Sequence, residues 1–222
     1  PGLNGLQEPF GRGRVVRTIS QSGWVESDDN RYDLALLVLD RPMGQQAGYM
    51  EIAAEPESFF VDRNLNTTGY PGETKPGNIQ YHAAGTSMDV QGGLIRHTLD
   101  SEPGQSGSPI WYYQADQQSR KVVGVLTGSR QFTANGQTVD AYNVGVRIDS
   151  VFAQWINDTL IKYDTVTQDT AIESADIPQA APVCGSGAPA AMVMALVLMS
   201  AVRFTTAARR KREREVARRT EA

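Results

Sequence analysis

The chain has 222 residues, of which 40% are hydrophobic and 21% charged, and its formal net charge is −4. This length suits one domain of roughly 150–200 residues with appendages, or two small domains, and the composition is that of a globular protein. Eight of the 21 Lys and Arg residues lie in 203–222, so the rest of the chain is acidic, which argues against nucleic-acid binding. The single cysteine, Cys184, excludes an intrachain disulfide but leaves the redox compartment open.

Most of residues 1–163 read as short strands separated by turns. The expected strands are β-branched or aromatic runs, and clusters of Gly, Pro, Asn and Asp lie between them. These runs are 14–20, 32–40, 94–100, 108–113, 121–128 and 142–149. Many short strands with turn signals between them predict an all-β sandwich or barrel.

One amphipathic helix is expected after the last strand, in "DSVFAQWINDTLIKY" (149–163). Its apolar residues recur at helical spacing, and Asp149 or Ser150 can cap its start. A single amphipathic helix in this place is expected to pack its apolar side back onto the β core.

The C-terminal part of the chain differs in composition. Residues 164–187 contain no Lys or Arg and no periodicity, which predicts an acidic flexible linker. Residues 188–202 carry no charge, and with Arg203 snorkelling and Phe204 included they predict a transmembrane helix over 188–204. The run is short for a membrane span, so an amphipathic or buried terminal helix is the alternative. With a span, the basic segment 205–222 would be a cytoplasmic tail and the acidic domain would lie outside.

The stretch "DSEPGQSGSPIW" (100–111) contains a candidate nucleophile, Ser106. A serine hydroxyl needs a base to take its proton and donors to hold the oxyanion that forms. Gly104 can turn the backbone so that its own N–H and that of Ser106 point at one spot, and Gly107 keeps the following chain clear of substrate. An ordinary Ser/Gly turn is the alternative reading of this motif.

A candidate partner, Asp33, stands at the head of the strongly apolar stretch "YDLALLVLD". A buried carboxylate there needs a partner, and orienting an imidazole is a common role for one. The alternative is an aspartate that only begins a strand after a turn.

The order DLALL…TGYPG…DSEPGQSGSP…VVGVLTG resembles the glutamyl-endopeptidase branch of the chymotrypsin-like, or trypsin-like, serine proteases, over residues from about 10 to 160. The resemblance implies two antiparallel six-stranded barrels with the active site between them, in a protease domain over 1–163. It also implies that Asp33 is the triad acid, that Ser106 is the nucleophile, and that the amides of Gly104 and Ser106 form the oxyanion hole.

The catalytic base is the part of this pattern that the sequence does not supply. In the family the histidine precedes the aspartate by more residues than lie before Asp33, and the chain opens with the loop-like "PGLNGLQEPFGRG" and no Met. We therefore expect an N-terminally truncated, inactive fragment with an incomplete first barrel. The alternative order Asp33–His97–Ser106 is that of subtilisins, whereas an α/β-hydrolase needs a histidine after Ser106 and none follows. We expect His97 to be structural or to line a subsite, and His82 to lie in a surface loop.

The resemblance also places the primary substrate pocket. Asp100 would lie at its base, and Leu126 stands where glutamyl endopeptidases have a histidine that recognises the substrate carboxylate. Ser101 and Thr127 remain as polar pocket candidates. This departure favours a basic or uncharged P1 residue. Gln105 stands where trypsin-type zymogens have an aspartate that binds the new N-terminus, so activation by that ion pair is not expected.

The segment around Cys184 resembles the tripartite C-terminal sorting tags of bacterial surface proteins, with a small-residue motif, an apolar helix and an arginine cluster. A sorting or processing enzyme would then cut or modify the chain at Cys184. The alternative is a plain tail anchor with an unmodified cysteine.

Together these features predict a secreted or surface-held serine endopeptidase that acts on polypeptides by acyl-enzyme chemistry. No metal, cofactor or nucleic acid is expected to bind, and the contact with a membrane would be through the C-terminal helix. Two alternatives stay open: an inactive binding or adhesion module on a protease scaffold, and an acyl hydrolase that does not cleave peptides.

Overall fold

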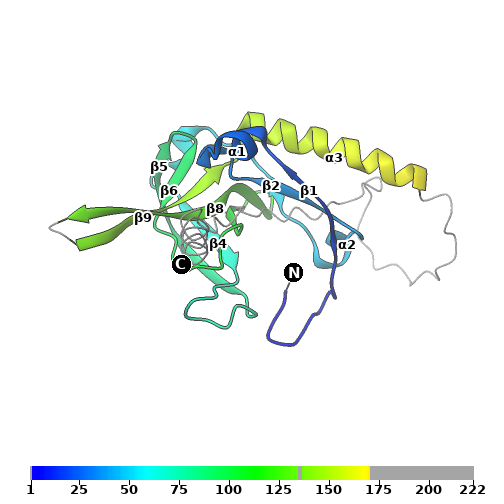
Figure 1. The fold of residues 1–222 in the computed structure, drawn as a ribbon, viewed down its shortest axis with the longest axis horizontal. Helices are drawn as coiled ribbons and strands as arrows, with labels where there is room; N and C mark the ends of the chain where they lie inside the picture. The colour runs from blue at the N-terminus through cyan, green and yellow to red at the C-terminus, as the bar shows by residue number, and fades with distance from the viewer. Residues whose placement is uncertain (1, 135–136, 171–222) are drawn as a thin grey trace, which may run out of the picture.

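The computed structural model describes residues 2–134 and 137–170, and six of its strands close into an antiparallel barrel (Figure 1). The strand order is β8-β7-β4-β5-β6-β9, and a further pairing of β8 with β9 closes the ring. The strands are β4 (Asn64–Gly69), β5 (Tyr81–Gln91), β6 (Leu94–His97), β7 (Pro109–Gln114), β8 (Ser119–Ala134) and β9 (Gln137–Arg147). Closure leaves no free edge within the ring, and the long β8–β9 hairpin projects from it.

The interior of the barrel is filled by one cluster of apolar side chains. The strands contribute alternate residues to it, as the two-residue period of a β-strand requires. Its buried members are Phe60, Leu65, Ile95, Leu99, Ile110, Tyr112, Val123 and Leu126. On β9, Gly145 is needed for this packing, because an added Cβ would meet the Ile110 side chain and lie 2.6 Å from the Val125 carbonyl oxygen.

A separate two-stranded sheet lies beside the barrel. Strand β1 (Val15–Ser20) pairs antiparallel with β2 (Ala35–Leu39), and the short helices α1 (Ser22–Ser27) and η1 (Asn30–Tyr32) join them. The first of the two expected barrels is therefore represented by this sheet. The all-β class with a closed barrel is confirmed.

The connection from this sheet to the barrel runs through three short elements. They are α2 (Gly44–Ala47), β3 (Glu51–Ile52) and η2 (Glu57–Phe60). Strand β3 pairs in parallel with β8, with Glu51 opposite Lys121, so the connecting segment is fixed along the barrel wall.

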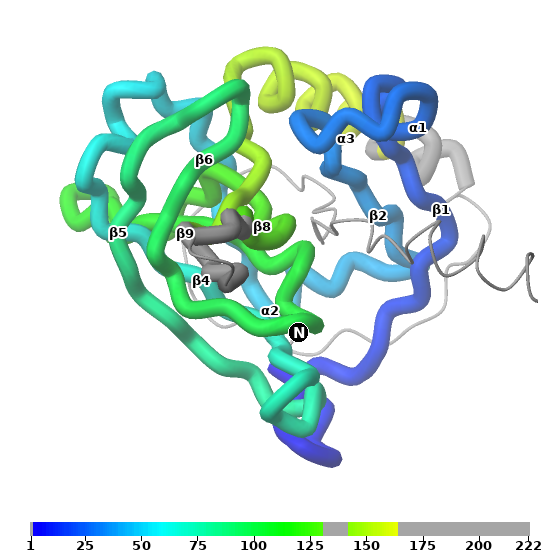
Figure 2. The backbone as a smooth tube through the Cα atoms, turned by 60° about the vertical axis from the view of Figure 1, so that its left-hand side comes forward, coloured from blue at the N-terminus to red at the C-terminus, as the bar shows by residue number. Residues whose placement is uncertain are grey.

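Helix α3 (Ser150–Thr170) lies across both sheets (Figure 2). Asp149 caps it, because its Oδ1 accepts the Phe152 amide at 2.9 Å. Phe152 and Ile156 pack with residues of the β2 segment and of the barrel wall in a second buried cluster. The expected C-terminal helix is confirmed, and it continues into residues 164–170, so the start of the segment predicted as a linker is helical.

None of the helices in the described part of the chain is long and apolar enough to span a membrane. The predicted transmembrane helix (188–204), the basic tail (205–222), Cys184 and most of the predicted linker (164–187) lie outside the described residues.

Candidate active site

Ser106 lies in the loop between β6 and β7, which is hydrogen-bonded to β8. The Gly107 amide donates to the Leu126 carbonyl at 2.8 Å, and the Leu126 amide donates to the Ser108 carbonyl at 2.9 Å. The Ser106 hydroxyl donates to the Thr127 carbonyl at 3.3 Å. The serine is half-buried, so its side chain is oriented by the barrel while one side stays open.

The two glycines that flank this serine both adopt left-handed backbone conformations. Gly104 has φ +99° and Gly107 has φ +90°, values that an L side chain rarely adopts. A Cβ on Gly104 would also lie 2.9 Å from the Gly72 amide nitrogen and 3.0 Å from the Tyr70 carbonyl oxygen. The "GQSG" motif is therefore required by the backbone of this loop.

The amides of the loop fall into two groups. Those of Gln105, Gly107 and Ser108 donate to backbone carbonyls. Those of Gly104 and Ser106 donate no hydrogen bond within residues 2–134 and 137–170. Unsatisfied amides at these two positions are what an oxyanion hole requires, since its donors must be available to a developing negative charge.

Asp33 lies at the end of η1, immediately before β2, and is 6% exposed. Asp33 is thus both a buried carboxylate and a residue of the turn that precedes β2, while Ser106 lies in a loop of the barrel. The candidate triad residues therefore come from segments next to the two different sheets of the fold.

The two histidines occupy other places. His97 on β6 is fully buried, and its Nδ1 accepts the Leu99 amide at 3.2 Å. Burial lowers the pKa of His97 to about 4, although the backbone of Val144 opposes the shift. A buried ring whose acceptor nitrogen is already used cannot take the proton of Ser106, so the structure excludes the subtilisin-like order.

His82 lies on β5 and not in a loop. Its ring is exposed, and its Nε2 is 3.1 Å from Asn66 Oδ1. The ring centroid lies 5.9 Å from that of Trp111 on β7. His82 is thus held on the outer surface by its strand neighbours.

The candidate pocket residues differ in how far they are buried. Leu126 is 2% exposed and packs inside the barrel, while Ser101 and Thr127 are half-buried. Asp100 is exposed, because the chain after β6 stays extended and its side chains alternate between buried His97 and Leu99 and exposed Thr98 and Asp100. The role of Asp100 as a pocket base stays a prediction.

Sequence reasoning did not predict the contacts of three polar residues in or beside the Ser106 loop. Gln105 is 4% exposed and its Oε1 accepts the Glu102 amide at 2.8 Å. Glu102 in turn accepts from Thr74, a residue of the loop between β4 and β5. No local pattern signals this contact, because 28 residues separate its partners.

Comparisons with known proteins agree with this fold and motif order. The chain is 31% identical to serine protease 23 of Bos taurus over 144 residues, which is 61% of this chain and 37% of that protein. It is also 31% identical to the glutamyl endopeptidase of Bacillus licheniformis over 111 residues, which is 50% of this chain and 34% of that protein. The chain thus spans about a third of the length of these relatives. No family model matches.

Solved structures show the same fold. A Glu endopeptidase solved in complex with MPD matches with a TM-score of 0.59 and 24% identity, over 72% of this chain and 69% of that one. A thermostable serine protease, AL20, matches with a TM-score of 0.54 and 18% identity, over 70% of each chain. The resemblance to trypsin-like serine proteases of the glutamyl-endopeptidase kind is therefore confirmed.

Proposed function

We propose that this homologue of the trypsin-like serine proteases carries the nucleophile of a serine endopeptidase at Ser106. One observation carries the proposal: the amides of Gly104 and Ser106 donate no hydrogen bond in the described part of the chain, while the neighbouring amides do. Gly104 is exposed and Ser106 is half-buried, so both amides are accessible to a substrate oxygen beside the serine hydroxyl. The serine protease relatives support a polypeptide as the substrate.

The reaction is acyl transfer in two halves. Ser106 Oγ attacks the peptide carbonyl carbon while a base takes the hydroxyl proton, and the Gly104 and Ser106 amides hold the oxyanion. When the intermediate collapses, the C–N bond breaks and the base returns the proton to the leaving amine. Water then attacks the ester in the same way, which releases the acid and restores the serine hydroxyl.

The base has to come from outside residues 1–222. The chain has two histidines, and His97 is buried with its Nδ1 engaged while His82 is held on the outer wall of the barrel. A histidine supplied by another segment would be oriented by Asp33, which is buried between η1 and β2. We therefore expect residues 1–222 on their own to be inactive.

We also propose a basic or uncharged P1 preference. Leu126 supplies no cation for a glutamate carboxylate, because it is an apolar residue packed into the barrel. The half-buried Ser101 and Thr127 could contact an uncharged side chain, and the carboxylate of Asp100 could attract a basic one. A peptide library that varies P1 tests this, and a clear preference for glutamate would contradict it.

For the location of the protein, we propose a domain held on the outer side of a membrane. Support comes from the sequence alone: the uncharged run at 188–202, the basic tail after it, and Cys184 as a site for a processing enzyme. Labelling of the tail and of the domain by membrane-impermeant reagents on intact cells would test the orientation.

A fluorophosphonate probe tests the enzymatic proposal. We expect a longer form of the chain that supplies a histidine N-terminal to Asp33 to be labelled at Ser106 and to cleave peptides. Ser106→Ala should abolish both, Ser129→Ala should change neither because Ser129 is an exposed residue of β8, and Asp33→Asn should lower kcat about 10⁴-fold.

Each negative result of this experiment would favour a different alternative. Labelling without peptide cleavage would favour a non-peptidase acyl hydrolase, and a longer chain with a histidine that is neither labelled nor active would favour a binding module. Robust peptidase activity of residues 1–222 alone would refute the argument that the base is supplied from elsewhere.

A further inference from the structure

The loop that carries Ser106 is held in a turn by hydrogen bonds from the backbone and side chain of Gln105. The Gln105 backbone amide donates to the Glu102 carbonyl at 3.1 Å, and the Gln105 side chain returns, with its Oε1 accepting the Glu102 amide at 2.8 Å. Gln105 is 4% exposed, so these bonds are shielded from water. The turn that presents Gly104 and Ser106 is thus held from inside.

The same turn is also hydrogen-bonded to the loop 70–78. The Gly72 amide donates to the Pro103 carbonyl at 2.9 Å. The Thr74 amide donates to Glu102 Oε2 at 3.1 Å, and its hydroxyl donates to Glu102 Oε1 at 2.7 Å. Hydrogen bonds to a carboxylate are about twice as strong as neutral ones. Consistent with this, the Thr74 side chain and amide hold the pKa of Glu102 below its usual value, and Lys75 adds to the effect.

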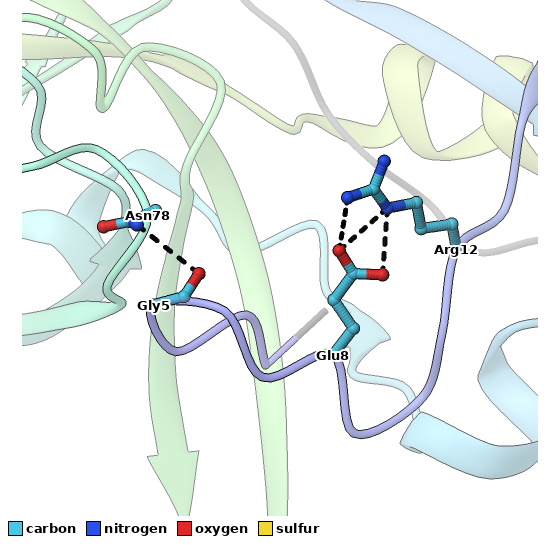
Figure 3. Close-up of polar contacts among 4 residues, drawn as sticks. All are labelled: Gly5, Glu8, Arg12 and Asn78. Carbon is cyan, nitrogen blue, oxygen red and sulfur yellow. Dashed lines mark hydrogen bonds and ion pairs between the residues drawn. The ribbon is translucent and has the colours of Figure 1, made fainter.

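The loop 70–78 is itself braced at its far end by the first residues of the chain (Figure 3). The Gly5 amide donates to the Asn78 carbonyl at 2.8 Å, and the Asn78 side-chain amide donates back to the Gly5 carbonyl at 3.4 Å. A salt bridge between Glu8 and Arg12 closes the same N-terminal segment. The loop 70–78 is therefore hydrogen-bonded to the Ser106 loop through Gly72 and Thr74 and to the N-terminal segment through Asn78.

We propose that Thr74 and Glu102 form a latch that positions the oxyanion amides of Gly104 and Ser106, so that the loop 70–78 acts as a positioning element for the reaction. This rests on the proposed function of Ser106. The latch works through Gly104, whose backbone lies between Gly72 and Tyr70 with no room for a side chain. Glu102 and Thr74 are positioning residues, because neither needs to touch the substrate.

The first test measures amide exchange by NMR in the chain of residues 1–222, where no catalysis is needed. Glu102→Ala removes the carboxylate that accepts both Thr74 bonds, so it should raise the exchange rates of the Gly72 and Gln105 amides at least about tenfold. Thr74→Val removes the hydroxyl bond and keeps the backbone amide bond, so it should raise the same rates by less. Glu73→Gln is the matched control, since it removes one negative charge from the same exposed loop. The Ile148 amide, which donates to the Val123 carbonyl in the barrel, should be unchanged and reports that the variants are folded.

The second test measures kinetics in the longer, histidine-supplied form. Loss of the latch should lower kcat about tenfold or more with KM within about twofold, because the oxyanion exists only after attack has begun. Glu102→Gln should fall between wild type and Glu102→Ala, since an amide oxygen can still accept from the Thr74 hydroxyl. Glu73→Gln should leave kcat unchanged.

The outcomes separate the latch from the proposed function. Unchanged exchange in Glu102→Ala, or faster exchange with an unchanged kcat, would overturn the latch while an active wild type left the function of Ser106 standing. An inert wild type whose Glu102→Ala amides still exchange faster would overturn the proposed function and support the link between the loops.

Discussion

His97 should make the stability of this domain depend on pH. Its ring is fully buried on β6, and the pKa of His97 falls from 6.5 to about 4 because burial penalises the charged form. Protonation would also place a hydrogen on Nδ1, which now accepts the Leu99 amide. The folded state therefore binds fewer protons than the unfolded state between pH 4 and 6.5.

The direction and the magnitude of the pH effect on stability follow from this difference in bound protons. Because the folded-state pKa is depressed, the free energy of unfolding is highest above pH 6.5 and falls as the pH drops toward 4, where the folded state is protonated as well. At about 1.4 kcal/mol per pKa unit, the contribution of His97 changes by about 3 kcal/mol across this window. That is a large part of the stability of an ordinary domain.

Urea denaturation at several pH values between 4 and 7 provides the measurement. Carboxylates titrate in the same range, so the quantity to follow is the difference between wild type and His97→Asn, whose side-chain oxygen can still accept the Leu99 amide. This difference should change by about 3 kcal/mol between pH 7 and pH 4. His82→Asn, altered at the exposed histidine, should keep the wild-type pH dependence. Parallel curves for wild type and His97→Asn would refute the reasoning.

Three further substitutions test the packing of the fold by urea denaturation. Gly145→Ala should destabilise by about 2 kcal/mol, because the new Cβ would lie 2.6 Å from a backbone carbonyl, whereas Gly128→Ala on β8, with open space around it, should have little effect; equal effects would contradict the packing argument. Phe152→Ala should cost about 3–4 kcal/mol because Phe152 is 7% exposed between the sheets and α3, while Val151→Ala, 72% exposed, should cost far less. Asp149→Ala should cost about 1 kcal/mol through loss of the helix cap, and an unchanged stability would show that the cap is dispensable.

The strands that local patterning predicted are those with β-branched or apolar runs, such as 14–20 and 121–128, observed as β1 and within β8. Strands β4 and β5 were not predicted. Their sequences, NLNTTG and YHAAGTSMDVQ, contain few large apolar residues, and barrel neighbours on both sides supply their hydrogen bonds. A strand that is stabilised mainly by its neighbouring strands is difficult to predict from its own residues.

The residues of the candidate site also divide into those that a local motif predicts and those that depend on the tertiary structure. Ser106, Gly104 and Gly107 could be identified from a short motif, because the positive φ angles of the two glycines are a local property of the turn. The exposure of Asp100, the engagement of His97 with Leu99, and the contact of Glu102 with Thr74 could not, since each depends on where a strand or a second loop passes in space.

By itself, the sequence determined the all-β class, the C-terminal helix with a cap at Asp149 or Ser150, and the "GQSG" motif around Ser106. These properties depend on residue type and on spacing within one segment, so they are present in the sequence before any tertiary contact forms. Only the tertiary structure decided that six strands close into a ring, that the Gly104 and Ser106 amides donate no hydrogen bond to any of the described residues, and that the loop 70–78 contacts the loop of Ser106. These are relations between segments far apart in the chain, and only the packed fold brings them within hydrogen-bonding distance.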